Sequence, residues 1–533
     1  MLAAFPYLTN LIFLPIVGAV ILMVLKVDDT GARFITLCIG IVETLLALTL
    51  LGGFALGDAG WQFVELKPWM PQAGLTYHLA VDGLSLFMVV LSAVLLPLCT
   101  LCSWTYISRR VKEFHVCLLL MTGACVGVFV AMDLVLFYIF WEAMLVPMYL
   151  LIAVWGGPRR RYASIKFFLY TLAGSTLLLA AIVALYVHEG TFSIPQLMQG
   201  DYAFGFQCWI FLAMALAFAI KVPMFPFHTW LPAAHVEAPS AGSVLLASVL
   251  LKMGTYGFLR FCIGLTPLGA DYFAPLMLAI SVASILYGGF VALGQQDMKK
   301  LIAYSSVAHM GFVTLGIFVF TQAGVEGALM VMLNHGIVTG ALFMMVGAIY
   351  ERSHSREISD NMGLGRHLPA FMGFFGLFAL ASLGFPGLNS FVGELLVLIG
   401  AFEFNTWMGL VAIPGAMLAA AYMLRLGLKM AYGQPASPAG KGWGDLNPRE
   451  WLYLAPLAFL TLYLGIAPGL ALKVVTPSVE KLLTEYRAKV HMTMHATAQA
   501  TEQATTQAET APASPALAGL HAPLAGMTQG EVR

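Results

Sequence analysis

The stretch AFAIKVPMFPFHTWLPAAH, residues 217–235, places a lysine in an apolar helix that two prolines interrupt directly afterwards. A lysine at membrane depth is costly unless it meets a partner or water. Pro223 and Pro226 carry no backbone donor, so the helix opens just after Lys221. Freed carbonyl groups are tolerated at this depth only where protein buries them or where they line a polar cavity. A charge beside a helix break therefore indicates an ion path through a transport protein.

The composition of the chain is that of a polytopic membrane protein. Of 533 residues, 60% are hydrophobic and 10% are charged, and the formal net charge is zero. This charge balance gives no indication of nucleic acid as a partner. Cys99 and Cys102 form a C-x-x-C pair inside an apolar run without a second pair nearby. We interpret them as small core residues, with a metal or cluster site as the alternative.

Apolar runs long enough to cross a bilayer recur along the chain and predict an all-α fold with about fourteen transmembrane helices. The polar and aromatic residues 57–80 predict an ordered external loop instead of a span. The predicted spans are 7–27, 31–56, 81–107, 114–131, 133–155, 163–188, 205–235 (broken), 239–264, 271–293, 300–320, 325–350, 368–402 (broken), 407–432 and 449–472.

Two of these helices are broken, at 221–226 and at 384–387, where Gly384, Pro386 and Gly387 interrupt an apolar run. The two broken helices lie five helices apart, and an odd offset places successive units in opposite membrane orientation, which predicts inverted five-helix repeats. The resulting segments are 1–110 (helices 1–3), 111–264 (first half, helices 4–8), 265–432 (second half, helices 9–13), 433–491 (the final helix and an amphipathic surface segment at 475–490) and 492–533. The last segment is rich in Ala, Thr, Gln and Pro and is predicted to be a disordered spacer, with a docking tail as the alternative.

The distribution of basic residues predicts the orientation of the chain. Alternate loops hold most of them, and we expect these loops to be cytoplasmic. The opposite loops are poor in basic residues, with Lys67 and Arg260 as the main exceptions. Both termini then lie on the periplasmic side of a bacterial inner membrane. The basic loops carry Lys26, Arg33, Arg109, Arg110, Lys112, Arg159, Arg160, Arg161, Lys299, Lys300, Arg352, Arg356, Arg366, Lys429, Lys441 and Arg449.

Three ionisable residues lie deep in the first half. Glu142 lies near the middle of its span, and Lys221 and Lys252 are its natural partners. A nearby cation keeps a buried carboxylate ionised, and a buried lysine gives up its proton more readily than an exposed one. We therefore expect Glu142 to handle protons in a direct or water-bridged pair with Lys221; a structural ion pair between helices is the alternative.

Histidines and a second carboxylate continue this series of ionisable groups. His228 follows the first break, and His309 and His335 lie in later spans. Imidazole passes a proton through its two nitrogens, so the three predict a relay, with hydrogen-bonded core histidines as the alternative. Glu394 follows the second break and is predicted to hold a transient proton; a fixed pair with a basic residue of a neighbouring subunit is the alternative.

Five segments, in this order and spacing, resemble the antiporter-like M subunits of proton-pumping NADH–quinone oxidoreductase, respiratory complex I (chain 4 in mitochondria). The likeness extends from about residue 77 to about 432, and about fourteen helices are also the family's number. The tail after 492 lies outside the family pattern. The segments are FYIFWEAMLVPMYLLI (137–152), AFAIKVPMFPFHTWLPAAHVEAPSAGSVLLASVLLKMG (217–254), AYSSVAHMGF (303–312), NHGIVTGALF (334–343) and GFPGLNSFVGE (384–394).

The resemblance implies a role for each matched residue. Glu142 and Lys221 correspond to the family's glutamate–lysine pair, Lys252 to its central lysine, and Glu394 to the terminal carboxylate of the exit half. His309 and His335 correspond to the connecting histidines. Glu394 favours subunit M among the sister subunits, because subunits L and N usually have lysine there.

The resemblance also implies what this chain leaves to others. Flavin mononucleotide, the iron–sulfur clusters and the quinone site belong to partner subunits, and the chain has neither a Rossmann glycine fingerprint nor a set of cysteine ligands. We expect no cofactor here. The expected partners are the other membrane subunits of complex I, including the sister antiporter-like subunits, together with the lipid bilayer and protons. A D-type subunit of a multisubunit sodium/proton antiporter, or a membrane hydrogenase relative, is the alternative.

Overall fold

The structure is a computed structural model, and it describes residues 5–434 and 442–510, with side chains described through residue 492. The chain divides into two units, Met1–Tyr486 and Arg487–Arg533. All candidate site residues belong to the first unit.

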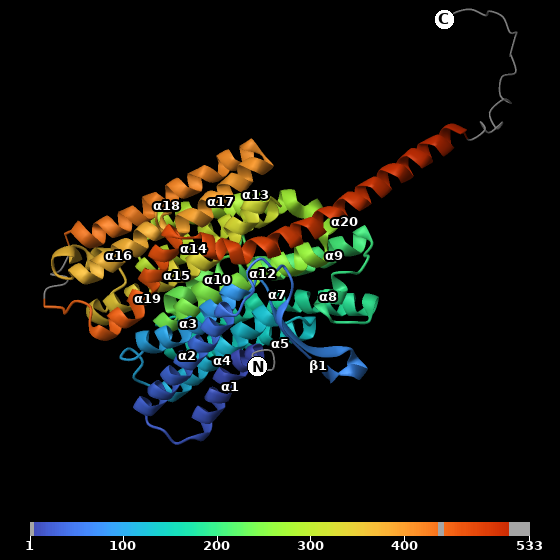
Figure 1. Ribbon diagram of the computed structural model, residues 1–533. Helices are drawn as coiled ribbons and strands as arrows, with labels where there is room; N and C mark the ends of the chain where they lie inside the picture. The colour runs from blue at the N-terminus through green and yellow to red at the C-terminus, as the bar shows by residue number, and fades with distance from the viewer. Residues whose placement is uncertain (1–4, 435–441, 511–533) are drawn as a thin grey trace, which may run out of the picture. The chain divides into compact units, whose positions relative to one another are not determined.

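Apolar helices make up most of the first unit (Figure 1). Within the described residues, eleven helical stretches are long and apolar enough to cross a membrane, and two of them, Leu134–Trp155 and Ser240–Ile263, are each made of consecutive shorter helices. In chain order the helices are α1 (Tyr7–Val24), α2 (Asp29–Gly52), α3 (Leu86–Cys102), α4 (Val111–Val130), α5 (Leu134–Ala143), α6 (Leu145–Trp155), α7 (Arg160–Glu189), α8 (Ile194–Leu197), α9 (Phe204–Lys221), α10 (Trp230–Glu237), α11 (Ser240–Leu245), α12 (Leu251–Gly257), α13 (Pro267–Gly294), α14 (Met298–Phe318), α15 (Gln322–Ser353), α16 (Pro369–Ser382), α17 (Asn389–Phe404), α18 (Thr406–Tyr432), α19 (Pro448–Ile466) and α20 (Gly469–Thr510).

Each of the predicted spans overlaps a helix or an interrupted pair of helices, and the predicted all-α membrane class is confirmed. The span predicted at 133–155 consists of two helices, α5 and α6, which meet at Met144. Pro147 explains this interruption, because it offers no donor to the carbonyl one turn earlier. The segment boundaries at 110, 264 and 432 fall at helix ends, and the inverted repeats remain a prediction.

The predicted external loop at 57–80 contains a β-hairpin. Strands β1 (Gln62–Met70) and β2 (Leu75–Val81) pair antiparallel, and Gly74 turns the chain with φ +69°. The Glu65 carboxylate accepts hydrogen bonds from the Leu8 and Thr9 amides at 2.7 and 3.1 Å, so the hairpin is fixed to the start of α1. The segment is ordered and does not span, as predicted.

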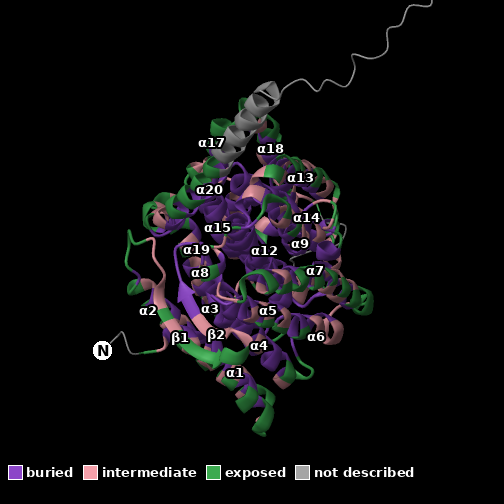
Figure 2. Cartoon of the chain, turned by 90° about the vertical axis from the view of Figure 1, so that its right-hand side faces the viewer, coloured by how far each residue is buried: buried purple, intermediate pink, exposed green. Residues whose placement is uncertain are grey.

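The core of the unit lies where α12, α14 and α15 meet. The helical stretch Ser240–Ile263, which contains α12, and α15 have every residue of their apolar windows buried. In Figure 2 the buried purple residues gather around α12, α14 and α15, and green exposed patches lie on outer helices such as α1 and α7. Large apolar side chains on outer helices, such as Leu169 and Met417, are exposed. This distribution is expected when lipid or neighbouring subunits replace water around a helix bundle.

Arg260, which was predicted to lie in a loop on the outer side, lies inside a helix. Arg260 is buried within the helix that follows α12, where its Nη2 donates to the Asp82 carboxylate at 2.7 Å. It is therefore not a loop residue of the outer side, and its ion-pair partner Asp82 lies four residues before the start of α3. Two opposite charges buried together offset each other's cost of leaving water.

The end of the described chain differs from its prediction. The amphipathic segment at 475–490 lies within α20, which is bent by 71° from α19. The helix continues to Thr510, past residue 492, where the disordered tail was predicted to begin. The high helix propensity of Ala, Gln and Glu in this stretch accounts for the difference. Residues 511–533 of the predicted tail lie outside the described residues.

Candidate functional site

Lys221 is the last residue of α9, and only 1% of it is exposed. Its Nζ lies 3.6 Å from the Met144 sulfur and 4.9 Å from the centre of the Trp141 ring. Both partners belong to the junction of α5 and α6, so the interrupted helix supplies the surroundings of the lysine. A thioether and an aromatic face are weak partners for an ammonium group. Among the described residues, the Lys221 ammonium therefore has weak partners and no strong hydrogen-bond acceptor.

The helix break after Lys221 is stabilised by side chains that replace the missing backbone bonds. The Trp230 indole donates to the Ile220 carbonyl at 2.8 Å, and the Phe225 amide donates to the Ser284 hydroxyl at 2.9 Å. These bonds satisfy groups that an unbroken helix would have paired. The opening at Pro223 and Pro226 is thus a fixed feature of the fold, as predicted from the prolines.

Glu142 lies beside Lys221 without touching it. The two charges interact through space, but no ion pair within 4 Å joins them among the described residues. The Glu142 Oε1 is buried and accepts no hydrogen bond from any residue that the structure describes. The direct form of the predicted pair is therefore not formed in this structure, and the water-bridged form remains a prediction.

His228 is not joined to either lysine by a hydrogen bond. It is buried in the break between α9 and α10, where its ring stacks near Phe225 and packs against Tyr287, with ring centres 5.9 and 4.9 Å away. Neither ring nitrogen has a hydrogen-bond partner in the part of the chain that the structure describes. Among the described residues, His228 thus has no hydrogen bond that would support the predicted relay role.

Lys252 lies at the centre of the protein and is fully buried. Two π-helical turns, Leu246–Leu250 and Phe258–Ile263, flank its own helix α12. A π turn widens the helix and is frequent at functional sites. Here the Ala247 carbonyl accepts a hydrogen bond from the Lys252 ammonium. These two turns were not predicted.

The Lys252 ammonium also contacts a histidine of α15. Its Nζ lies 2.7 Å from the Nδ1 of His335. An ammonium group only donates, so His335 Nδ1 accepts this bond and Nε2 carries the ring hydrogen. Nε2 has no partner of its own within the described protein, and it is the nitrogen available to pass a proton onward.

His335 and His309 border a common small cavity. Their ring centres are 5.6 Å apart, and the cavity of about 10 Å³ is also lined by Glu394, Ser382, Ser390 and Thr339. This volume is close to what a single water molecule requires, and the polar lining offers it several partners. The cavity therefore borders both imidazoles.

His309 connects the cavity to Glu394. Its Nδ1 lies 2.9 Å from Glu394 Oε1, and its Nε2 lies 3.3 Å from the Tyr422 hydroxyl of α18. His309 and Glu394 are each 5% exposed. The Tyr422 contact was not predicted, since a tyrosine in an apolar helix carries no distinctive sequence signal.

The second break forms the seat of Glu394. Gly384 has φ +76°, and a Cβ placed on it would lie 2.7 Å from Glu394 Oε2. The glycine therefore supplies both the left-handed turn and the space for the carboxylate. The break is fixed to α15 because the Asn334 side-chain amide donates to the Asn389 carbonyl at 2.7 Å. Asn334 was also missed, although it directly precedes His335.

The structure thus brings together four of the seven predicted site residues. Lys252, His335, His309 and Glu394 follow one another across α12, α15, α14 and α17. We call these four residues the central relay. Each is a group that takes up and releases protons, so the arrangement suits proton transfer along the middle of the membrane region. Within the described residues, no group of three or more His, Cys, Asp or Glu is placed to hold a metal ion.

Comparison with known proteins identifies the family. The family model described as NADH:quinone oxidoreductase/Mrp antiporter, transmembrane, matches residues 131–419. NADH-quinone oxidoreductase subunit M of Rhodobacter capsulatus is 46% identical over 499 residues, which cover 90% of this chain and 97% of that protein. NADH-ubiquinone oxidoreductase chain 4 of Chondrus crispus is 40% identical over 85% of this chain and 93% of its own length.

Solved structures agree with this assignment. A chain of respiratory complex I from Thermus thermophilus superposes with a TM-score of 0.83 and 33% identity, covering 90% of this chain and 99% of its own. A chain of the Mrp complex from Dietzia has the same fold, with a TM-score of 0.77 and 22% identity over 95% of this chain and 57% of its own. The resemblance derived from the sequence motifs is confirmed: the chain is a multi-pass membrane protein that belongs to the transmembrane family shared by NADH:quinone oxidoreductases and Mrp antiporters.

Proposed function

We propose that this chain is a proton-translocating membrane subunit of respiratory complex I. The observation that carries the proposal is the central relay, in which Lys252 contacts His335 and His309 contacts Glu394 at 2.7 and 2.9 Å. Ionisable groups at membrane depth are costly and are retained where they serve a path for ions or protons. The 46% identity to a subunit M supports the choice of complex.

Lys221 and Lys252 hold protons, Glu142 adjusts the proton affinity of Lys221, and Glu394 receives the proton at the far end. The weak partners of Lys221 support this division, because a lysine without a strong acceptor responds to the movement of a nearby carboxylate. His335 and His309 carry the proton between Lys252 and Glu394, with one water in the cavity between them. His228 lies beside Lys221 along the chain, and water would have to connect it to the path.

The electron-transfer chemistry takes place in partner subunits. Flavin mononucleotide, iron–sulfur clusters and quinone are bound there, and this chain contributes no redox group. Its partners are the other membrane subunits of the complex, including the sister antiporter-like subunits. The chain lies in a bacterial inner membrane with both termini on the periplasmic side, an orientation supported by the basic residues of alternate loops.

A D-type subunit of a multisubunit sodium/proton antiporter is the second candidate. The fold shared with the Dietzia Mrp complex and the name of the family favour it. The two candidates differ in what drives the protons. Loss of this chain abolishes NADH-driven pumping under the first proposal, and abolishes sodium/proton exchange with intact NADH oxidation under the second.

Replacement of the central lysine tests the first proposal. Lys252→Met keeps the length of the side chain and removes its titratable group. Inverted membrane vesicles carrying the assembled variant complex are expected to lose at least about tenfold in NADH-driven proton uptake, the change that a barrier increase of about 1.4 kcal/mol produces. Lys429→Met, at the half-buried end of α18, is the control and retains uptake.

Assembly is measured on the same membranes by native gel electrophoresis and by NADH oxidation with a soluble acceptor. An assembled Lys252→Met complex that takes up protons at the parent rate would contradict the proposal. Loss of assembly in Lys252→Met is resolved with Lys252→Gln, which keeps a polar group that can bond to the Ala247 carbonyl.

A further inference from the structure

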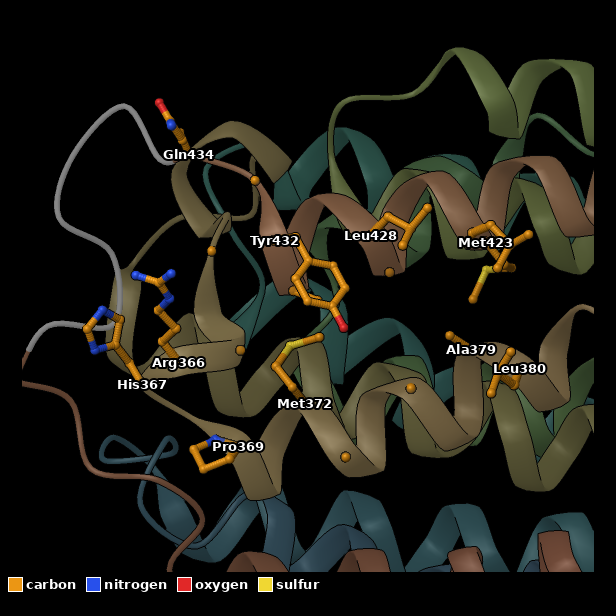
Figure 3. A pocket seen from close by; sticks show the side chains of 18 of the residues that line it. Arg366, His367, Pro369, Met372, Ala379, Leu380, Met423, Leu428, Tyr432 and Gln434 are labelled. Carbon is orange, nitrogen blue, oxygen red and sulfur yellow. The ribbon is translucent and has the colours of Figure 1, made fainter.

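A groove runs between α16 and α18, outside the central relay. Its volume is about 1030 Å³ (Figure 3). In Figure 3, Met372 and Leu380 on one helix and Met423 and Leu428 on the other lie on its two sides.

Glycines create the hollow. Gly373 and Gly376 on α16 and Gly427 on α18 line the groove. A Cβ placed on any of the three would meet nothing within 4 Å. Three side chains are therefore missing from the facing surfaces of the two helices. Leu424 and Leu428 on α18 are 45% and 56% exposed, so the groove opens on the outside of the bundle.

The groove has a polar mouth at one end. Arg366 and His367 line it just before α16 begins, and both are exposed. Neither side chain forms a hydrogen bond or an ion pair with another described residue. The first free amides of α16, those of Ala370 and Phe371, are already bonded to the Asp445 carboxylate at 2.8 and 3.0 Å. The side chains of Arg366 and His367, and not the helix end, are thus available to an anion.

The dimensions of the groove match one leaflet of a bilayer. Its lining extends from Met372 on α16 to Leu383 at the end of that helix, and a helix of that length rises about 17 Å. The hydrocarbon of one leaflet is about 15 Å thick, half of the roughly 30 Å core. The mouth then lies at the level of the headgroups, where Tyr432, 81% exposed, also lies.

The geometry points to a phospholipid site: the phosphate of an anionic phospholipid binds to Arg366 and His367, and one acyl chain lies in the groove over Gly373, Gly376 and Gly427. Guanidinium groups bind phosphate through two parallel hydrogen bonds. Basic pockets between transmembrane helices on the cytoplasmic side suit anionic headgroups, and Arg366 belongs to the basic loops. Methionine, leucine, alanine and glycine residues make up most of the lining along the two helices, and such walls suit an acyl chain better than a soluble ligand.

The site is tested on the purified complete complex in nanodiscs that contain a phosphatidylglycerol with a photoactivatable group in one acyl chain. After illumination, mass spectrometry maps the labelled peptides. Label is expected on α16 and α18 in the parent. Gly376→Leu fills the groove and raises helix propensity, and it should lower this label at least fivefold. Gly205→Leu, at an exposed helical glycine with nothing within 4 Å, is its control and leaves the label unchanged.

The headgroup contact is tested separately. Arg366→Gln combined with His367→Gln should lower the label at least threefold, whereas Lys26→Gln, at an exposed residue of another basic loop, does not. Parent complex without label on α16 and α18, or undiminished label in Gly376→Leu, overturns the site. Undiminished label in the double variant overturns the phosphate contact. A helix of a neighbouring subunit in the groove, seen in a density map of the complex, also overturns the site.

Discussion

Gly384→Ala is expected to disturb the end of the central relay without replacing any titratable residue. Gly384 has φ +76°, and an alanine in this left-handed region costs about 1–2 kcal/mol. The new methyl group would also lie 2.7 Å from Glu394 Oε2, whereas ordinary contact begins at 3.4 Å. The carboxylate has to retreat, and its 2.9 Å contact with His309 has to lengthen.

The size of the effect follows from that contact. A hydrogen bond to a charged group contributes about 1.5–3 kcal/mol. Losing about half of it in the step that delivers the proton to Glu394 lowers the rate about three- to tenfold, since each 1.4 kcal/mol of barrier is a factor of ten. NADH-driven proton uptake by inverted vesicles, normalised to assembled complex, measures this directly.

Gly387→Ala separates backbone strain from displacement of the carboxylate. Gly387 has φ +90°, but its Cβ position meets nothing within 4 Å. Both variants therefore lose a similar amount of stability, and only Gly384→Ala loses proton uptake beyond that loss. Equal uptake in the two variants at equal assembly would refute the seat assigned to Glu394.

Two further predictions concern the first half of the chain. Glu142→Gln removes the charge that acts on Lys221, so it should reduce proton uptake and, where coupling is tight, NADH oxidation by the assembled complex; parent uptake would contradict the pair. Trp230→Phe removes the donor to the Ile220 carbonyl and leaves a buried acceptor unpaired, at a cost of about 1–3 kcal/mol. A lower unfolding temperature of the purified complex measures this cost, and Trp209→Phe, at a residue 75% exposed, should leave that temperature unchanged.

The sequence was sufficient for the helices and for both breaks because their causes are local. Runs of apolar residues set the spans, and Pro223, Pro226, Gly384 and Gly387 interrupt them. The charges of Lys252 and Glu394 were also identifiable, since a charged side chain is rare at membrane depth. These features depend on residues that are adjacent in the chain, so they can be predicted from the sequence alone.

What the sequence could not provide depends on packing between distant segments. The contact of Tyr422 with His309 joins α18 to α14, and the separation of Glu142 from Lys221 depends on where the α5–α6 junction places Trp141 and Met144. The π turns beside Lys252 arise in a stretch without proline, so no residue marked them. The helix beyond 492 was not predicted because this stretch has few large apolar residues. It forms nonetheless, because its Ala, Gln and Glu residues have high helix propensity.

Substitution of Glu394 tests the central claim most directly, through the number of protons taken up per NADH oxidised in vesicles with equal amounts of assembled complex. Glu394→Gln keeps the shape and removes ionisation, whereas Glu394→Asp keeps ionisation. The account predicts a reduced yield or turnover with Gln and a smaller loss with Asp, because the carboxylate beside His309 receives the proton. If both variants assemble equally and pump like the parent, Glu394 is not on the route and the central relay does not carry protons.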